Sequence, residues 1–403
     1  MNDAVSAGGV TGTNAACDVA IAGGGLVGLA AAYELATRGA RVTVVDAGRT
    51  GRATDAGAGI LAPDTHPATE AFWWDMAHDA GDHYPRLLER LESDGIDTEG
   101  SGYARCGLLS LGLRESEERW FGPFAERVTR RSEGRVREIT PDAAVALFPP
   151  LGPVHRALHY ADAARIDGRG MAEALRQGSA RRGVRFVSGT VAGVVAVRPA
   201  ASRPGSPQAA SYRGTPQAVH RVQVSDHEDL QCGALLVAGG AWSAAIGDRL
   251  SCPLPITPTK GQIVHLGTKH DTGDWPLVQP LLTHYLVPWP DGRVACGGTF
   301  EPGAGFSATV TAAGLHELLR ECLLVAPGLA DAEHLTTRVG LRPTSADDRP
   351  VVGAVPGWSN VWVATGHGAN GLLLGPHSAA LVAAQMTGEH VAIPAELDPA
   401  RFA

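Results

Sequence analysis

A glycine-rich turn near the start of the chain constrains the fold more than any other feature. In the stretch DVAIAGGGLVGLAAAYELATRGARVTVVD, Gly23, Gly25 and Gly28 form a GxGxxG pattern between a short apolar run and an alanine-rich segment. A second apolar run follows and ends at Asp46. The order of strand, glycine turn, helix, strand and acid is what a dinucleotide-binding βαβ unit requires.

Each part of this unit has its own expected task. Gly23 permits the tight turn, Gly25 lets a pyrophosphate approach the backbone, and Gly28 lets the helix pack on the strand. The helix start offers free N–H groups and a positive dipole end to phosphates, and Asp46 would accept hydrogen bonds from ribose hydroxyls. The alternative is a glycine turn in an ordinary α/β protein, but this alternative does not explain why an acid, Asp46, ends the second strand. Asp46 also argues against the 2′-phosphate of NADP.

The segment after Asp46 favours FAD over NAD. Residues 47–62, AGRTGRATDAGAGILA, are nearly all small and hold no helical period, so we expect a loop close to a ligand. An NAD domain would continue directly into further βαβ units, whereas the next α/β pieces here lie far along the chain. FAD, a long dinucleotide that can lie between distant segments of the chain, fits this order better than NAD does.

Composition narrows the class of partner. The chain has 403 residues, 44% of them apolar, which suits a globular protein of two or three domain-sized bodies. A net charge of -8 argues against nucleic acid and against an anionic membrane surface, so we expect a small-molecule partner. Six scattered cysteines without a CxxC pair predict reduced thiols, no bound metal and a cytoplasmic location. We expect neither a signal peptide nor a transmembrane segment.

The rest of the chain predicts alternating helices and strands without a repeat of 20–50 residues. Residues 198–218 are rich in proline, serine, glycine and alanine, which predicts a flexible hairpin extension, and residues 1–16 predict a disordered tail. The main helices are expected over 69–91, 115–148, 168–182 and 311–325.

A second glycine-rich run lies near the C-terminus. NVWVATGHGANGLLLGPHSAALVAAQMTG predicts a strand over 361–365 and a helix that ends near Gly388, with Pro376 in its first turn. The glycines leave backbone N–H groups open at the helix start. Such a terminus can hold partial positive charge against a flavin ring and stabilise its reduced form.

Six motifs together resemble one family. GGGLVGLAAAYELATRG, AGAGILAP, VAGGAWS, HYLVP, VGLRPTSADDRPVVG and ATGHGANGLLLGP occur in the order seen in the D-amino-acid oxidase (DAO) family of flavoenzymes, and the chain is most similar to the glycine oxidase branch. The resemblance implies an α/β fold, α+β overall. It implies a Rossmann-type FAD-binding domain with a parallel sheet (17–76, 156–250 and 335–403). An antiparallel-sheet substrate-binding domain (77–155 and 251–334) would be interleaved with it.

The resemblance also implies a non-covalent FAD site drawn from distant segments, since no cysteine stands where a covalent flavin would attach. The implied residues are Gly23, Gly25, Leu26, Val27, Gly28, Asp46, Ala47, Thr54, Ala58, Gly59, Ile60, Val191, Gly240, His367, Gly368, Ala369, Asn370, Gly371, Leu372 and Leu373.

Two further residues would bind the substrate. Arg342 in GLRP matches the family's carboxylate-binding arginine, and a guanidinium can grip a carboxylate with two parallel hydrogen bonds. Tyr285 in HYLVP matches the tyrosine that supports this carboxylate; alternatively it is only an aromatic residue on an amphipathic strand. His367 is open to two interpretations, a general base or a histidine satisfied by backbone contacts.

By resemblance, the chemistry is oxidation of a small amino acid or amine, such as glycine, sarcosine, a D-amino acid or a cyclic imino acid. Hydride would pass from the α-carbon to flavin N5 across about 3–3.5 Å, giving an imine and, with dioxygen, hydrogen peroxide. Glycine oxidase-like enzymes carry an arginine where this chain has Ala369, which favours a bulkier or secondary amine.

Three alternatives stay open at this point. The enzyme could be a dehydrogenase that reduces a quinone or a carrier protein, or it could oxidise a 2-hydroxy acid. A flavin-binding protein without turnover is the third. The sequence also leaves the oligomeric state open, a homo-oligomer included.

Overall fold

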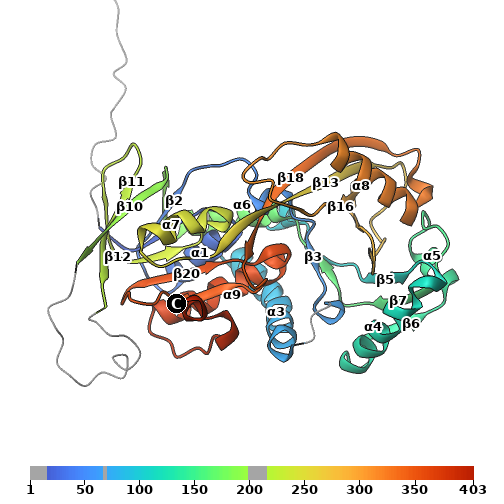
Figure 1. Ribbon diagram of the computed structural model, residues 1–403, viewed down its shortest axis with the longest axis horizontal. Helices are drawn as coiled ribbons and strands as arrows, with labels where there is room; N and C mark the ends of the chain where they lie inside the picture. The colour runs from blue at the N-terminus through green and yellow to red at the C-terminus, as the bar shows by residue number, and fades with distance from the viewer. Residues whose placement is uncertain (1–15, 67–69, 198–215) are drawn as a thin grey trace, which may run out of the picture.

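Two large sheets organise the molecule and lie side by side in Figure 1. The structure, a computed structural model, describes residues 16–66, 70–197 and 216–403. The predicted tail and most of the predicted hairpin extension, at 1–15 and 198–215, lie outside the described residues. Within the described ranges, no helix combines the length and the apolar character needed to cross a bilayer.

The first sheet has eight strands and a parallel centre, and its order runs β10-β11-β12-β1-β2-β9, with β20 beside β12 and β19 beside β20. Parallel pairs join β12, β1, β2 and β9, and also β12 and β20. Its strands are β1 (Cys17–Ala22), β2 (Val42–Asp46), β9 (Arg185–Ser188), β10 (Val191–Val197), β11 (Ala218–Val224), β12 (Leu230–Val237), β19 (Val351–Ala354) and β20 (Val361–Thr365).

Helices pack tightly against this sheet. They are α1 (Leu26–Thr37), α3 (Ala71–Ser93), α6 (Gly168–Arg181), α7 (Ser243–Arg249) and α9 (Gly371–Met386). Helix α1 is buried over most of its surface because Ala30, Ala31 and Ala32 let α9 and α6 approach closely. An all-round apolar helix of this kind belongs inside a protein, so the predicted βαβ unit forms the centre of the core.

The second sheet has nine strands, all paired antiparallel except β5 with β14, and the order is β17-β13-β16-β15-β14-β5-β7-β6 with β18 beside β13. Helix α8 (Ala312–Val325) covers one face through Leu318 and Cys322. The strands are β5 (Leu108–Gly112), β6 (Val136–Ile139), β7 (Arg156–Tyr160), β13 (Ile256–Gly267), β14 (Leu277–Pro280), β15 (Tyr285–Pro288), β16 (Arg293–Gly297), β17 (Glu301–Pro302) and β18 (Glu333–Ser345).

Short elements complete the fold and correct one prediction. The expected helix over 115–148 is wrong, because α4 (Glu118–Arg131) and α5 (Pro141–Leu147) are separated by strand β6. Gly134 has a φ of +90°, a conformation that ends the helix, and Val136 then enters the core beside β7. A small three-stranded sheet holds β3 (Ile60–Leu61), β8 (Ala164–Arg165) and β4 (Ala104–Arg105), and α2 (Ala53–Ala56) precedes it.

The mixed α/β fold is as predicted, while the division into two interleaved domains stays a prediction. Strands β7 and β18 lie in segments assigned to the FAD-binding domain, yet both pair within the nine-stranded sheet. Helix α3, assigned mostly to the other domain, packs in the core of the eight-stranded sheet. The chain therefore passes between the two sheets at other points than the motifs indicated.

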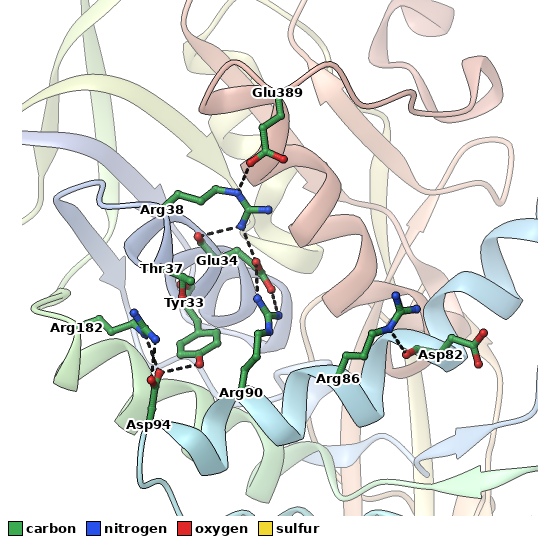
Figure 2. A network of polar contacts seen from close by, with 10 residues as sticks. All are labelled: Tyr33, Glu34, Thr37, Arg38, Asp82, Arg86, Arg90, Asp94, Arg182 and Glu389. Carbon is green, nitrogen blue, oxygen red and sulfur yellow. Dashed lines mark hydrogen bonds and ion pairs between the residues drawn. The ribbon is translucent and has the colours of Figure 1, made fainter.

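A buried carboxylate ties three helices together. Glu34 on α1 is 2% exposed and accepts hydrogen bonds from Arg38, with Nη1–Oε2 at 2.6 Å, and from Arg90 on α3 (Figure 2). Arg38 also pairs with Glu389, just after α9, at 2.7 Å. Burial alone would raise the pKa of Glu34, but the bonds and charges of Arg90 and Arg38 outweigh it and hold the pKa below its usual range.

We expect Glu34→Ala to lower the free energy of unfolding by about 2 kcal/mol, because two partly buried guanidinium groups lose their partner. A lowered folded pKa stabilises the protein above the unfolded value, about 4.3, and this stabilisation is lost as pH falls through the folded value. Denaturant unfolding should therefore show a larger difference between wild type and variant at pH 7 than at pH 3.5. An equal difference at both pH values would contradict the assignment.

Candidate active site

One elongated cavity of about 350 Å³ is lined by residues from both large sheets. Its wall includes the turn after β1, the loop after β2, strands β13, β15 and β18, and the connection from β20 to α9. Every residue predicted to bind cofactor or substrate lines this cavity, with the exception of Gly28. Segments that are far apart in the sequence therefore meet around one space.

The turn before α1 is shaped for close approach of a ligand. Gly23 has a φ of +116°, and a Cβ there would lie 2.4 Å from the Ala238 carbonyl oxygen. Gly28 has the packing role expected of it, since its Cβ would lie 1.9 Å from the Gly23 carbonyl oxygen. The Leu26 N–H donates to Thr54 Oγ1 at 3.0 Å, which fixes the loop after β2 against the helix start.

Asp46 ends β2 beside this turn and remains partly accessible, at 30% side-chain exposure. It accepts hydrogen bonds from Arg52 Nη1 at 3.1 Å and from the Gly48 N–H at 3.2 Å. A bare helix start, a glycine turn and an accessible carboxylate on one wall fit the pyrophosphate and ribose of FAD. The predicted roles of Gly23, Gly25 and Asp46 toward FAD stay predictions.

The β20–α9 connection also lines the cavity. Helix α9 begins at Gly371, after a short 3-10 turn at Gly368–Asn370. Pro376 therefore lies in the second turn of the helix, whereas the sequence predicted it in the first turn. Proline has no N–H for the Leu372 carbonyl, and the hydroxyl of Tyr84 on α3 donates to that carbonyl instead. Tyr84 thus stabilises the first turn of α9 where it faces the cavity.

His367 is a poor candidate for a general base. It is 3% exposed, and burial lowers its pKa to about 4. Its Nε2 lies 3.0 Å from Ser378 Oγ, and that hydroxyl in turn donates to the Leu374 carbonyl. His367 Nε2–H therefore donates to Ser378, a residue of α9. This favours a structural histidine over a general base, although its partner is a serine hydroxyl and not a backbone group.

Three glycines make room for Arg342 and Tyr285. A Cβ on Gly261 would lie 2.2 Å from Arg342 Nη1, and one on Gly298 would lie 3.0 Å from Nη2. A Cβ on Gly297 would lie 2.8 Å from the Tyr285 hydroxyl oxygen. The strand register explains the grouping, since Arg342 lies opposite Thr259, two residues from Gly261, and Tyr285 lies opposite Gly297. The two side chains therefore lie directly against the backbone of these glycines.

The charge of Arg342 is not balanced by a neighbouring acid. Its Nη1 donates to the carbonyl oxygens of Thr299 at 2.9 Å and Lys260 at 3.4 Å, and no carboxylate in the described ranges lies within ion-pair distance. Burial raises the pKa of Tyr285 to about 12, against the opposing effect of the Arg342 charge, so its hydroxyl stays protonated. A cation and a hydroxyl donor together can bind a carboxylate.

A buried polar network behind the sheet supports this arrangement. Gln262 Nε2 donates to Glu301 Oε1 at 2.7 Å, and the Gln262 N–H donates to Thr299 Oγ1 at 2.9 Å. Lys260 Nζ lies 3.0 Å from Glu301 Oε2. The network fixes Thr299, whose carbonyl accepts from Arg342, and so positions the guanidinium from the opposite side of the sheet.

Sequence reasoning missed several residues of the cavity wall, among them His66 and Gln279. His66 stacks on Trp73 with ring centroids 5.0 Å apart, and its Nε2 lies 3.2 Å from Asn370 Oδ1. Burial lowers the pKa of His66, although the bond to Asn370 opposes the shift. Its position just after AGAGILAP was the one available signal. Gln279 sits in a strand without any motif.

Comparison with known proteins agrees with the site. The DAO family model, described as FAD dependent oxidoreductase, matches residues 18–385. The glycine oxidase of Pseudomonas aeruginosa is 31% identical over 91% of this chain and 92% of its own length. The uncharacterized oxidoreductase YurR of Bacillus subtilis is 34% identical over 87% of this chain and 90% of its own length. The crystal structure of iminodiacetate oxidase (IdaA) from Chelativorans sp. BNC1 is similar with a TM-score of 0.83 at 33% identity, covering 96% and 98% of the two chains.

These matches span nearly the whole chain and include both sheets, the glycine turn and the β20–α9 connection. The residues around the cavity fit the cofactor that the family uses, as the bare helix start and Asp46 indicate. The resemblance to the glycine oxidase branch is confirmed, and the chain belongs to the DAO family of FAD-dependent oxidoreductases.

Proposed function

We propose that this enzyme oxidises small amino acids, above all N-substituted glycines, with non-covalently bound FAD. The product is an imine and, with dioxygen as acceptor, hydrogen peroxide; we propose the cytoplasm as the location. The observation that carries the proposal is Arg342, a guanidinium on the cavity wall that has no carboxylate partner among the described residues and lies beside the neutral hydroxyl of Tyr285. An α-amino acid brings the carboxylate that this pair lacks.

The chain's own residues orient the substrate. Arg342 and Tyr285 hold the carboxylate, which fixes the α-carbon and the amine relative to the cavity axis. FAD, when bound, supplies the hydride acceptor and passes the electrons on to dioxygen. Ile263 and Ala62 contribute apolar side chains to the cavity wall. Catalysis then depends on placement and not on proton abstraction by a strong base, since burial lowers the pKa of both His66 and His367 and so makes them weak bases.

Ala369 supports a substituted amine over glycine itself. It lies on the cavity wall in the turn before α9, where its methyl group leaves open the volume that a long basic side chain would fill. Two proteins similar to this chain are a glycine oxidase and an iminodiacetate oxidase, and both names refer to amino acids with an unbranched α-carbon. Substrates such as sarcosine and iminodiacetate combine that α-carbon with a secondary amine.

An anaerobic bleaching screen tests the proposal. Purified holoenzyme would be mixed with sarcosine, iminodiacetate, glycine, D-alanine and L-proline, and with glycolate as the 2-hydroxy acid matched to glycine. We expect sarcosine or iminodiacetate to bleach the flavin fastest and glycolate to leave it oxidised. Oxygen uptake measured beside reduction of an artificial dye distinguishes an oxidase from a dehydrogenase. Bleaching by glycolate alone, or by none of the compounds, would refute amine oxidation.

A further inference from the structure

Gln279 lies on the cavity wall next to the proposed carboxylate site. Val278 of β14 pairs with Leu286 of β15 in antiparallel register, which brings the following residue, Gln279, beside Tyr285. Side chains alternate along β14, so Leu277 joins the apolar cluster that includes Ile263 and Tyr285, while Val278 joins the cluster under α8. Gln279 therefore shares a face with Leu277 and Tyr285 and lines the same cavity as Arg342.

The amide of Gln279 lacks a protein partner. Within residues 16–66, 70–197 and 216–403, its side chain makes no hydrogen bond. Gln262 on β13 shows how the fold treats a buried amide: its Nε2 donates to Glu301 and to Thr311 Oγ1, and its Oε1 accepts from the Thr311 N–H at 3.0 Å. A half-buried amide among apolar neighbours needs a partner from water or from a ligand.

We propose that Gln279 binds a second hydrogen-bond-accepting group of the substrate, such as the carboxylate of an N-carboxymethyl arm. Neighbouring strands lie about 4.8 Å apart, so Gln279 lies roughly one strand spacing beyond Tyr285, away from Arg342. A substrate held at Arg342 and Tyr285 reaches this amide only through an additional arm. The amide N–H₂ group donates to that arm and selects two-armed amines over sarcosine. This inference rests on the proposed function, because it takes Arg342 as the first anchor.

Redox-inert ligands test the proposal without turnover. Thiodiacetate and (methylthio)acetate differ in one carboxylate arm and carry sulfur in place of the amine. Their dissociation constants would be measured from perturbation of the flavin spectrum of the holoenzyme. We expect wild type to prefer thiodiacetate and Gln279→Leu to reduce the ratio of the two affinities about tenfold, the loss of one hydrogen bond to a charged group. Gln279→Glu, which adds a repelling charge, should reduce it further.

The controls separate the possible failures. Gln231→Leu makes the same change on the exposed part of β12 and should keep the wild-type ratio. If Gln279→Leu weakens both ligands equally, the amide binds the group that they share, and if it weakens neither, the amide binds water only; either result overturns the proposal. If the ratio changes as expected but no amine bleaches the flavin, then the proposed amine oxidation fails while the role of Gln279 stands.

Discussion

Arg342→Ala should reduce kcat/KM for amino-acid substrates about 10³-fold and leave the protein yellow. Under the proposed function the guanidinium makes two charge-assisted hydrogen bonds to the substrate carboxylate, together about 4 kcal/mol, which corresponds to three powers of ten in rate. Among the described residues it makes no ion pair, and it donates hydrogen bonds to the carbonyl oxygens of Lys260 and Thr299 beside Tyr285, so the variant should still fold and bind FAD. Steady-state oxygen or dye assays with the absorbance spectrum as a folding check would measure both effects.

Two controls define the role of Arg342. A primary amine without a carboxylate should be oxidised slowly by wild type and at a similar rate by the variant. Arg342→Lys should recover only a small part of the loss, because one ammonium cannot form the paired bonds of a guanidinium. Wild-type kcat/KM on sarcosine in the alanine variant would rule out carboxylate binding by this residue.

Gly28→Ala should destabilise the FAD-binding region by about 3 kcal/mol or more and release the cofactor. The new Cβ would lie 1.9 Å from the Gly23 carbonyl oxygen, a backbone atom that cannot move without opening the turn before α1. Helix α1 lies in the centre of the core, so a shift of its first turn also disturbs its packing on α9. Thermal unfolding followed by flavin fluorescence should show a midpoint several degrees lower.

Gly100→Ala is the matched control for this prediction. A Cβ there meets no atom within 4 Å, and the glycine does not have a positive φ. Its midpoint should stay close to that of wild type. Equal midpoints for Gly28→Ala and wild type would show that the turn tolerates a side chain, against the geometry described above.

The parts of the site that sequence predicted well are those set by neighbouring residues. The glycine turn, Asp46 and the start of α9 each depend on a few consecutive positions, and their residue types reveal the backbone that they require. The structure brings them to one cavity, as the motif order indicated. Family resemblance added Arg342 and Tyr285, which no local pattern would have selected.

The parts that sequence did not predict depend on strand pairing across long separations. Gly261, Gly297 and Gly298 are ordinary strand glycines until register sets them against Arg342 and Tyr285. In the same way, β18 belongs to the nine-stranded sheet because it pairs with β13 over twelve residue positions, a fact that its own sequence does not carry. Pro376 resembled a first-turn proline because the hydroxyl that satisfies Leu372 comes from Tyr84, far away in the chain.

The glycines that lie against Arg342 and Tyr285 also limit how the substrate preference of this enzyme can change by mutation. A side chain at Gly261 or Gly298 would meet Arg342, and one at Gly297 would meet Tyr285, so under the proposed function mutation at these positions should weaken carboxylate binding before it alters substrate preference. New specificities would then arise at other positions of the cavity wall, such as Gln279 and Ala369. Related enzymes should therefore keep the carboxylate of the substrate and differ in the group at its other end.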